Sequence, residues 1–363
     1  MPSVMSQLDE LLSHLNEVQG SDLHLKPGAQ PHVRVDGQLR PAPFDPLAPG
    51  VVEALAASVL DEARMGDLEA TGETSSALSV AGLGRFRVAV HRQRGSLAMV
   101  VRRVPPEIPA LEDLGLPLQV ERFAEDDRGL ILITGPPGSG KTTTVSALLD
   151  RINRTRTCHI LTIEDPIEVL HADVKALMTQ REIGTDTLSY ADALRSGLRQ
   201  DADVIFVGEL VDAATARQAL TAAEVGHLVI STMRASSATD TVARLIELFP
   251  LAEQDLARQS LVSVLRGVVC QRLLERADGK GRVATAEILV GTSKVVDVVA
   301  DASRSAELEK VLADGQYHGM QTLDQALLEL VRDGLVSMRD ALASSTNPED
   351  LRIALGHAGL TTP

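Results

Sequence analysis

The chain has 363 residues, of which 44% are hydrophobic, enough for two or three domains with buried cores. Its 35 basic and 50 acidic residues leave a net charge of −15, which disfavours direct binding to nucleic acid or to anionic membranes. Aromatic residues make up only 2%, so platforms that stack single-stranded bases are not expected. Two distant cysteines, Cys158 and Cys270, exclude a disulfide framework and a zinc ribbon. No apolar run is long enough for a transmembrane helix, and the N-terminus is not a secretory signal.

The first hundred residues predict a small α/β domain. Leucines at helical spacing between Leu8 and Leu15 indicate a first helix. Asp36-Gly37 follows a strand candidate and is typical of a hairpin turn. The other expected elements are strands at Leu23–Leu25, His32–Val35, Phe86–Val90 and Ser96–Val104, and a helix near Val51–Leu60.

A proline-rich stretch, Val104–Pro109, predicts a linker, because its prolines cannot continue a helix or a strand. Beyond it, apolar runs alternate with helical segments, which predicts a parallel sheet wound on both faces. After residue 300 the chain is expected to be helical. The expected division is residues 1–104, a linker at 105–115, a second α/β domain at 116–300 and a helical end at 301–363. The apolar runs are Leu130–Thr134, Cys158–Ile163, Asp203–Val207 and His227–Ser231.

The segment Gly135–Thr142 matches the phosphate-binding loop G-x-x-x-x-G-K-[ST]. An apolar strand precedes it and a helix follows, which is the context that the loop requires, because backbone N–H groups and the helix N-terminus together cradle phosphate. Lys141 is expected to neutralise β- and γ-phosphate charge, and the Thr142 hydroxyl to bind Mg²⁺. The expected ATP-binding residues are Gly135, Pro136, Pro137, Gly138, Ser139, Gly140, Lys141, Thr142 and Thr143.

Acidic residues follow two of the predicted strands, at the sheet edge where α/β proteins bind ligands. Glu164 and Asp165 come after one strand and Glu209 after the next. A carboxylate at this edge can hold Mg²⁺ or polarise the attacking water; alternatively, these are ordinary surface acids. Gly208 stands where many P-loop proteins carry the Mg²⁺ aspartate, so Glu164 is a candidate for that task.

Six arginines lie between Arg85 and Arg103 without one acidic residue. They are candidates for arginine fingers that reach a nucleotide on a neighbouring subunit. A nucleic-acid patch is a second interpretation, which the net charge disfavours, and a charged strand edge that resists aggregation is a third.

Further motifs resemble the PilT family of type IV pilus retraction motors, within the secretion ATPase superfamily. The resemblance runs from Ser21–Leu25 to Asn347–Arg352. The segments that carry it are Ile160–Glu168, similar to the Asp box; Gln180–Gly184 and Ala193–Asp201; Val207–Glu209, similar to the Walker B end; and Gly319–Gln325, similar to a C-terminal signature.

The resemblance implies a PAS-like N-terminal domain, a RecA-like P-loop domain and a hexameric ring, either of this chain alone or mixed with a PilT paralogue. It implies that Glu209 is catalytic, with Glu164 and His227 as further candidates, and that Arg87 and Arg102 act in trans. It also implies a cytoplasmic ATPase at the inner face of the membrane, working on a pilus platform protein. Assembly-type relatives carry a four-cysteine zinc module, which this chain lacks.

Three signature sites depart from the family pattern. Arg234 replaces the second histidine of a box that begins at His227; Leu210–Asp212 replaces Met-Arg-Asp; and Gly291–Asp301 does not match the retraction motif. His227 itself could be a plain core histidine. The sequence therefore predicts a motor that powers or assists pilus retraction. The alternatives are a nucleotide-binding regulatory subunit of low activity, or a motor for type II secretion or DNA uptake.

Overall fold

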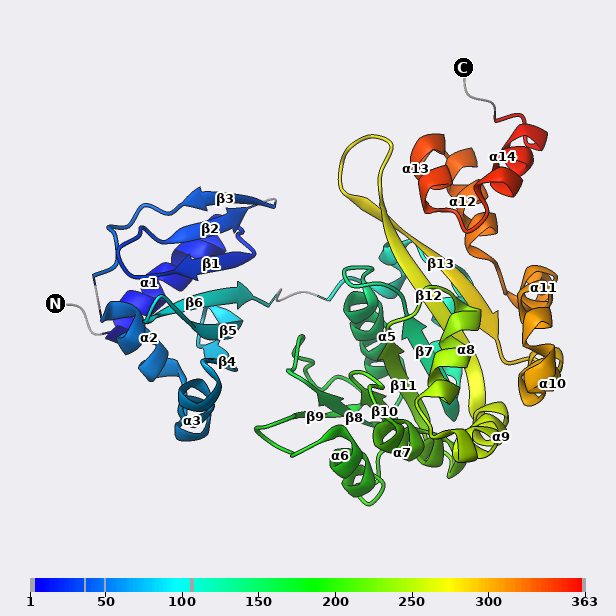
Figure 1. The fold of residues 1–363 in the computed structure, drawn as a ribbon, viewed down its shortest axis with the longest axis horizontal. Coiled ribbons are helices and arrows are strands. Elements are labelled where there is room, and N and C mark those ends of the chain that lie inside the picture. The colour runs from blue at the N-terminus through cyan, green and yellow to red at the C-terminus, as the bar shows by residue number, and fades with distance from the viewer. Residues whose placement is uncertain (1–3, 36, 49, 105–107, 361–363) are drawn as a thin grey trace. The chain divides into compact units, whose positions relative to one another are not determined.

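The computed structural model describes residues 4–35, 37–48, 50–104 and 108–360 (Figure 1). The chain divides into two compact units, Met1–Glu107 and Ile108–Pro363, which are considered separately below. The division falls at the proline-rich stretch where the sequence predicts a linker, although residues 105–107 of that stretch lie outside the described residues. In the described part of the chain, no helix is long and apolar enough to cross a bilayer.

In its described residues, the first unit is a six-stranded antiparallel sheet with three helices. Its strand order is β3-β2-β1-β6-β5-β4, so the first and last strands of the unit pair at the centre. The predicted strands and the first two helices are confirmed. The elements are α1 (Val4–Glu17), β1 (Asp22–Leu25), β2 (His32–Val35), β3 (Gln38–Pro41), α2 (Val51–Val59), α3 (Glu62–Thr71), β4 (Glu73–Val80), β5 (Gly84–Gln93) and β6 (Ser96–Arg103).

The alternation along these strands separates a core face from a polar face. The α1 leucines are fully buried against the core face. On the other face, Asp22 of β1 stands in register with Arg34 of β2 and Arg102 of β6, and Arg102 in turn faces Arg87 of β5. This cross-strand row places two of the predicted arginines side by side.

Two elements of the first unit were not expected, the helix α3 and the strand β4. The strand reads Glu-Thr-Ser-Ser-Ala-Leu-Ser-Val, and its small polar side chains hide the period-2 pattern of a strand. It forms because β5 pairs along its whole length. β2 and β3 pair as the predicted hairpin, although Asp36 of its turn lies outside the described residues.

The second unit is a seven-stranded sheet of order β13-β12-β7-β11-β10-β8-β9. Every neighbouring pair is parallel except β12 and β13, which form a long antiparallel hairpin at one edge. The predicted α/β fold with a parallel sheet is confirmed. The strands are β7 (Gly129–Thr134), β8 (His159–Glu164), β9 (Leu177–Glu182), β10 (Val204–Val207), β11 (Leu228–Met233), β12 (Leu265–Glu275) and β13 (Arg282–Val290).

Helices cover both faces of this sheet, because successive side chains of its buried strands point to opposite sides. In β7, Leu130 and Leu132 join one apolar core, whereas Ile131 and Ile133 join the other. The first core is completed by α6 (Tyr190–Gly197), α7 (Ala213–Glu224), α8 (Ala238–Glu247) and α9 (Gln254–Val264), and the second by α4 (Leu118–Arg122) and α5 (Lys141–Thr155).

The end of the chain is helical, as predicted, and forms two groups (Figure 1). The first group, α10 (Ser293–Ala300) and α11 (Leu308–Ala313), packs into the core that contains Leu130 and Leu132. The second group builds a small core of its own with side chains from β12 and β13. Its helices are α12 (Leu323–Arg332), α13 (Met338–Ser344) and α14 (Pro348–His357).

Candidate nucleotide site

The phosphate-binding loop connects β7 to α5 and depends on its glycines. Gly135 and Gly140 have φ angles of 136° and 89°, a region that other residues rarely adopt. A Cβ atom on Gly135 would lie 2.3 Å from the carbonyl oxygen of Gln271, and one on Gly140 would lie 2.8 Å from Nε2 of that side chain. At these two positions the loop therefore packs closely against Gln271 of β12.

Lys141 is the first residue of α5, and its side chain folds back over the loop. Its Nζ donates hydrogen bonds to the carbonyl oxygens of Gly135, at 2.9 Å, and Pro136, at 3.0 Å. Burial lowers the pKa of the ammonium, and the nearby Glu209 opposes that effect. Thr144 donates to Gln271 Oε1 at 2.7 Å and so ties the first turn of the helix to β12.

Glu164 ends β8 and is buried, with 8% of its surface exposed. Its Oε1 accepts hydrogen bonds from Thr162 Oγ1, at 2.6 Å, and Gln180 Nε2, at 3.2 Å. Its Oε2 accepts one from the backbone N–H of Glu168 at 3.3 Å. Burial raises the pKa of Glu164, and these hydrogen bonds oppose the rise. The carboxylate is therefore held in one position by donors from three directions.

Glu209 follows β10 and is positioned through its two neighbours. Gly208 donates from its N–H to the Ile163 carbonyl at 2.8 Å and accepts from Thr232 Oγ1 at 2.6 Å. Leu210 donates to the Thr232 carbonyl at 3.0 Å. The backbone on both sides of Glu209 is thus tied to the ends of β8 and β11.

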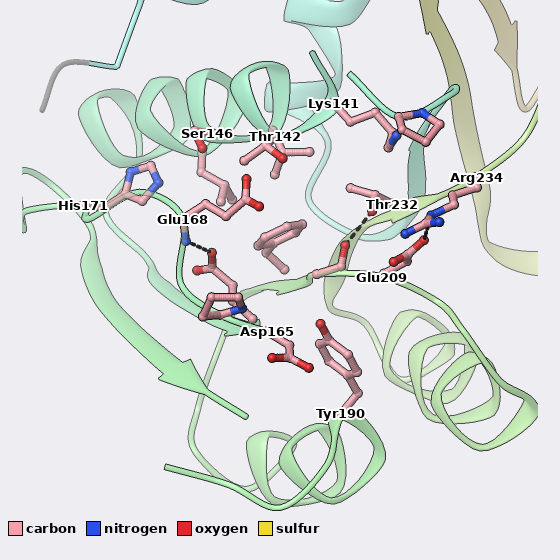
Figure 2. Close-up of a pocket in the computed structure, with 17 residues that line it drawn as sticks. Lys141, Thr142, Ser146, Asp165, Glu168, His171, Tyr190, Glu209, Thr232 and Arg234 are labelled. Atoms are coloured by element: carbon pink, nitrogen blue, oxygen red, sulfur yellow. Dashed lines mark hydrogen bonds and ion pairs between the residues drawn. The ribbon is translucent and has the colours of Figure 1, made fainter. Parts of the chain in front are cut away.

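One cavity of about 190 Å³ brings these residues together at the carboxyl end of the parallel strands (Figure 2). Lys141 and Thr142 line it from α5, and Glu164 and Glu209 line it from the strand ends. The cavity joins a phosphate loop with hard oxygen donors, the ligands that Mg²⁺ prefers. The Thr142 hydroxyl and the Glu164 carboxylate are oxygen donors of this kind.

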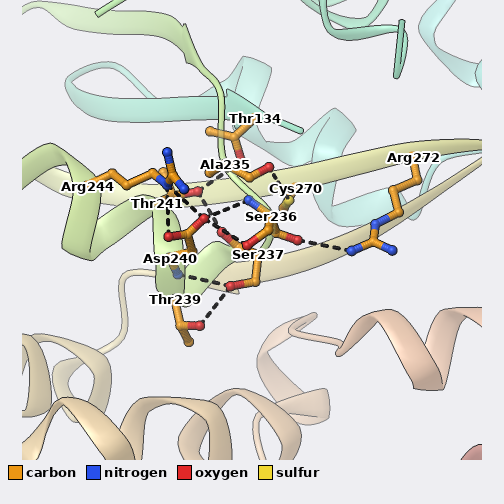
Figure 3. A network of polar contacts seen from close by, with 10 residues as sticks. All are labelled: Thr134, Ala235, Ser236, Ser237, Thr239, Asp240, Thr241, Arg244, Cys270 and Arg272. Atoms are coloured by element: carbon orange, nitrogen blue, oxygen red, sulfur yellow. Dashed lines mark hydrogen bonds and ion pairs between the residues drawn. The ribbon is translucent and has the colours of Figure 1, made fainter. Parts of the chain in front are cut away.

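Arg234 also lines the cavity, and its Nε lies 3.2 Å from Glu209 Oε1. The chain after Arg234 is held by a polar network (Figure 3). Asp240 accepts from the N–H and hydroxyl of Ser236, both at 2.8 Å, and Thr241 bonds to Thr134 at the end of β7 at 3.0 Å. The network fixes the backbone from which the arginine extends.

The structure places His227 apart from the other candidate residues. This residue precedes β11, whereas the cavity lies beyond the other end of that strand, about 20 Å away at the usual rise per residue. Its Nδ1 lies 2.7 Å from the Ala202 carbonyl oxygen, and the ring borders a separate surface hollow with Arg156 and Asp203. His227 is therefore not among the residues that the structure brings together at the cavity.

Several residues of the site were not predicted from the sequence as site residues. Gln271 accepts from Thr144 in the first turn of α5. Thr232 donates to the Gly208 carbonyl, and Gln180 donates to Glu164. Tyr190 lines the cavity from the first turn of α6. Such contacts depend on which strands become neighbours, and no spacing in the chain marks them.

The chain matches the family model described as Type II/IV secretion system protein over residues 2–343. It belongs to that family. It is 41% identical to the Pseudomonas aeruginosa protein named "Type IV pilus retractation ATPase PilT", across 94% of this chain and 99% of that protein. It is 36% identical to "Type IV pilus ATPase PilU" of the same species, across 96% and 91% of the two chains.

Among solved structures, the chain resembles one titled "Crystal Structure of the Pilus Retraction Motor PilT and Bound ADP". The TM-score is 0.87 at 41% identity, covering 96% of this chain and 98% of that one. The predicted resemblance to PilT and the RecA-like fold of the second unit are thereby confirmed.

Proposed function

We propose that this chain is an ATPase that powers or assists the retraction of type IV pili. One observation carries the proposal: a single cavity holds the phosphate-loop residues Lys141 and Thr142 opposite the carboxylates Glu164 and Glu209. Support comes from relatives named as pilus retraction and twitching motility proteins, of which the chain spans most of the length.

In this proposal each group of the cavity has a separate task. The Lys141 ammonium and the loop N–H groups bind the β- and γ-phosphates. Thr142 and Glu164 would hold Mg²⁺, which would offset the negative charge of the phosphates. Glu209 takes a proton from the attacking water as its oxygen approaches the γ-phosphorus. The buried walls of the cavity strengthen these electrostatic interactions.

The protein is proposed to work as a ring of six chains, alone or with a second PilT-like chain. A retraction ATPase and its paralogue PilU, both relatives of this chain, occur in one species, which makes a mixed ring a concrete possibility to test. Arg87 and Arg102 would then complete a neighbouring site. ATP-driven motion would act on a pilus platform protein at the cytoplasmic face of the membrane.

The test measures ATP hydrolysis by the pure chain, together with Lys141→Ala and the matched control Lys280→Ala. Lys280 lies in the turn between β12 and β13, away from the cavity. We expect Lys141→Ala to abolish hydrolysis and Lys280→Ala to preserve it. Unchanged turnover in Lys141→Ala would contradict the ATPase site.

A second measurement addresses the pilus. The host lacking this chain is complemented with the wild type or with Lys141→Ala, and retraction of labelled pili is counted. We expect only the wild type to restore retraction. Normal retraction in the uncomplemented strain would contradict the pilus role and leave the ATPase assignment standing.

A further inference from the structure

The phenol of Tyr190 reaches the cavity, and the mechanism above gives it no task. Tyr190 is the first residue of α6, whose N-cap Ser189 accepts a hydrogen bond from the N–H of Asp192. Figure 2 shows the ring rising from α6 into the cavity, with its hydroxyl end directed toward the space between Asp165 and Glu209. The capped helix start therefore aims this hydroxyl at the carboxylate side of the site.

The hydroxyl lies directly against Gly208. A Cβ atom on Gly208 would be 2.9 Å from Tyr190 Oη and 3.4 Å from its Cε1. The φ angle of Gly208 is not in the left-handed region, so its backbone conformation does not demand glycine. It is the close approach of the phenol that requires glycine at this position. Tyr190 thus takes up the space of a side chain at the position where many P-loop proteins carry an aspartate.

Carboxylates, which accept hydrogen bonds, lie around the Tyr190 hydroxyl. Burial and the charges of Asp165, Glu209 and Glu164 raise the pKa of the Tyr190 phenol, so it keeps its proton. Carboxylates only accept hydrogen bonds. Two hydroxyls at the neighbouring strand ends already donate elsewhere, Thr162 to Glu164 and Thr232 to the Gly208 carbonyl. The Tyr190 hydroxyl is a donor still available to a water molecule beside Glu209.

We propose that Tyr190 is a further catalytic residue, whose hydroxyl donates a hydrogen bond to the attacking water and fixes it beside Glu209. The inference rests on the proposed ATPase function. The water accepts from the phenol with one lone pair and attacks the γ-phosphorus with the other. One of its protons passes to Glu209 as the new P–O bond forms and the bond to the β-phosphate oxygen breaks. The phenol keeps its own proton throughout.

The test replaces the phenol without changing its ring. In Tyr190→Phe we expect kcat to fall about 3–10-fold, the value of one neutral hydrogen bond, with KM for ATP, ADP affinity and Tm unchanged. Binding of ADP with Mg²⁺ and aluminium fluoride, a mimic of the transition state, should weaken by a similar factor. Tyr317→Phe is the matched control, because that other tyrosine is 95% exposed, and it should change nothing.

A second variant tests the contact itself. Gly208→Ala should lower kcat in the wild type, because the new methyl group meets the hydroxyl at 2.9 Å. In the Tyr190→Phe background the same change should lower kcat by a smaller factor, because the phenol oxygen is absent. Full activity of Tyr190→Phe, or weaker ADP binding with a lower Tm, would overturn the proposal. A wild type without Lys141-dependent hydrolysis would overturn the proposed ATPase function instead.

Discussion

The guanidinium of Arg234 forms an ion pair with the carboxylate of Glu209, the proposed catalytic base, at 3.2 Å between Nε and Oε1. Both side chains are partly open to solvent, 69% for the arginine and 31% for the glutamate. An ion pair in such a setting is worth about 0.2–1 kcal/mol. The pair engages one carboxylate oxygen of the proposed base.

Arg234→His should raise kcat for ATP hydrolysis. Loss of an ion pair of that strength should raise kcat by about 1.4–5-fold, because 1.36 kcal/mol corresponds to a factor of ten. A histidine can also accept a hydrogen bond, which arginine cannot. Steady-state hydrolysis and ATP affinity are measured for both proteins in one buffer, and the affinity should not increase.

Arg304→His is the matched control, because Arg304 also pairs with a glutamate, at 2.8 Å, on an exposed short helix. Its turnover should equal that of the wild type. A wild type that hydrolyses ATP briskly and slows on Arg234→His would mean that the arginine replaces the family's histidine in function.

Glu209→Gln should separate binding from chemistry. The amide keeps the shape of the side chain but cannot take a proton, so hydrolysis should fall by about 10²–10⁴-fold while ATP still binds. Binding is followed with a fluorescent nucleotide and turnover by phosphate release. Glu329→Gln, on the exposed face of α12, serves as the control. Normal turnover in Glu209→Gln would transfer the role of base to Glu164 or another residue.

The arginines of the first unit are tested by mixing subunits. Arg87→Ala should bind ATP yet be inactive when it assembles with itself, because every site lacks the neighbour's arginine. Mixed with Glu209→Gln, which still supplies Arg87, some sites become complete and part of the activity should return. Co-assembly is verified by pull-down. A mixture that co-assembles without any recovery would argue against action in trans.

Asp22→Asn should destabilise the protein, because Asp22 is 5% exposed and accepts from Arg102 Nε at 2.7 Å. Burial raises the pKa of Asp22, but hydrogen bonds from Ser21 and Arg102 outweigh it and hold the pKa below its usual value. A carboxyl with a lowered folded-state pKa stabilises the protein above its unfolded pKa of about 3.9, and the effect disappears as the pH falls through the folded value.

We therefore expect Asp22→Asn to lower the free energy of unfolding by about 1–3 kcal/mol at pH 7. This difference should shrink toward zero in strong acid. Denaturant unfolding of the full chain at both pH values measures it. Asp278→Asn is the control, since Asp278 is a turn residue on the surface and should cost little at either pH. An equal loss at both pH values would show that charge at Asp22 is not the cause.

Local chemistry explains why much of this architecture could be predicted from the chain alone. The loop Gly135–Thr142 is contiguous, so its phosphate-binding function is written in neighbouring residues. Buried parallel strands such as β7 and β10 are continuous apolar runs, and their carboxyl ends share one edge of a sheet. These two facts were enough to place Glu164 and Glu209 beside the loop.

The features that the sequence did not predict depend on which strands and helices become neighbours in the fold. β4 is too polar to be recognised by itself and exists because β5 pairs with it. His227 and Arg234 belong to one motif, yet β11 carries them to opposite edges of the sheet, because an extended chain moves about 3.3 Å with each residue. Only that geometry placed Arg234 on Glu209 and removed His227 from the site. In the same way, the closeness of Tyr190 to Gly208 arises from the packing of α6 against the strand ends, which no local pattern encodes.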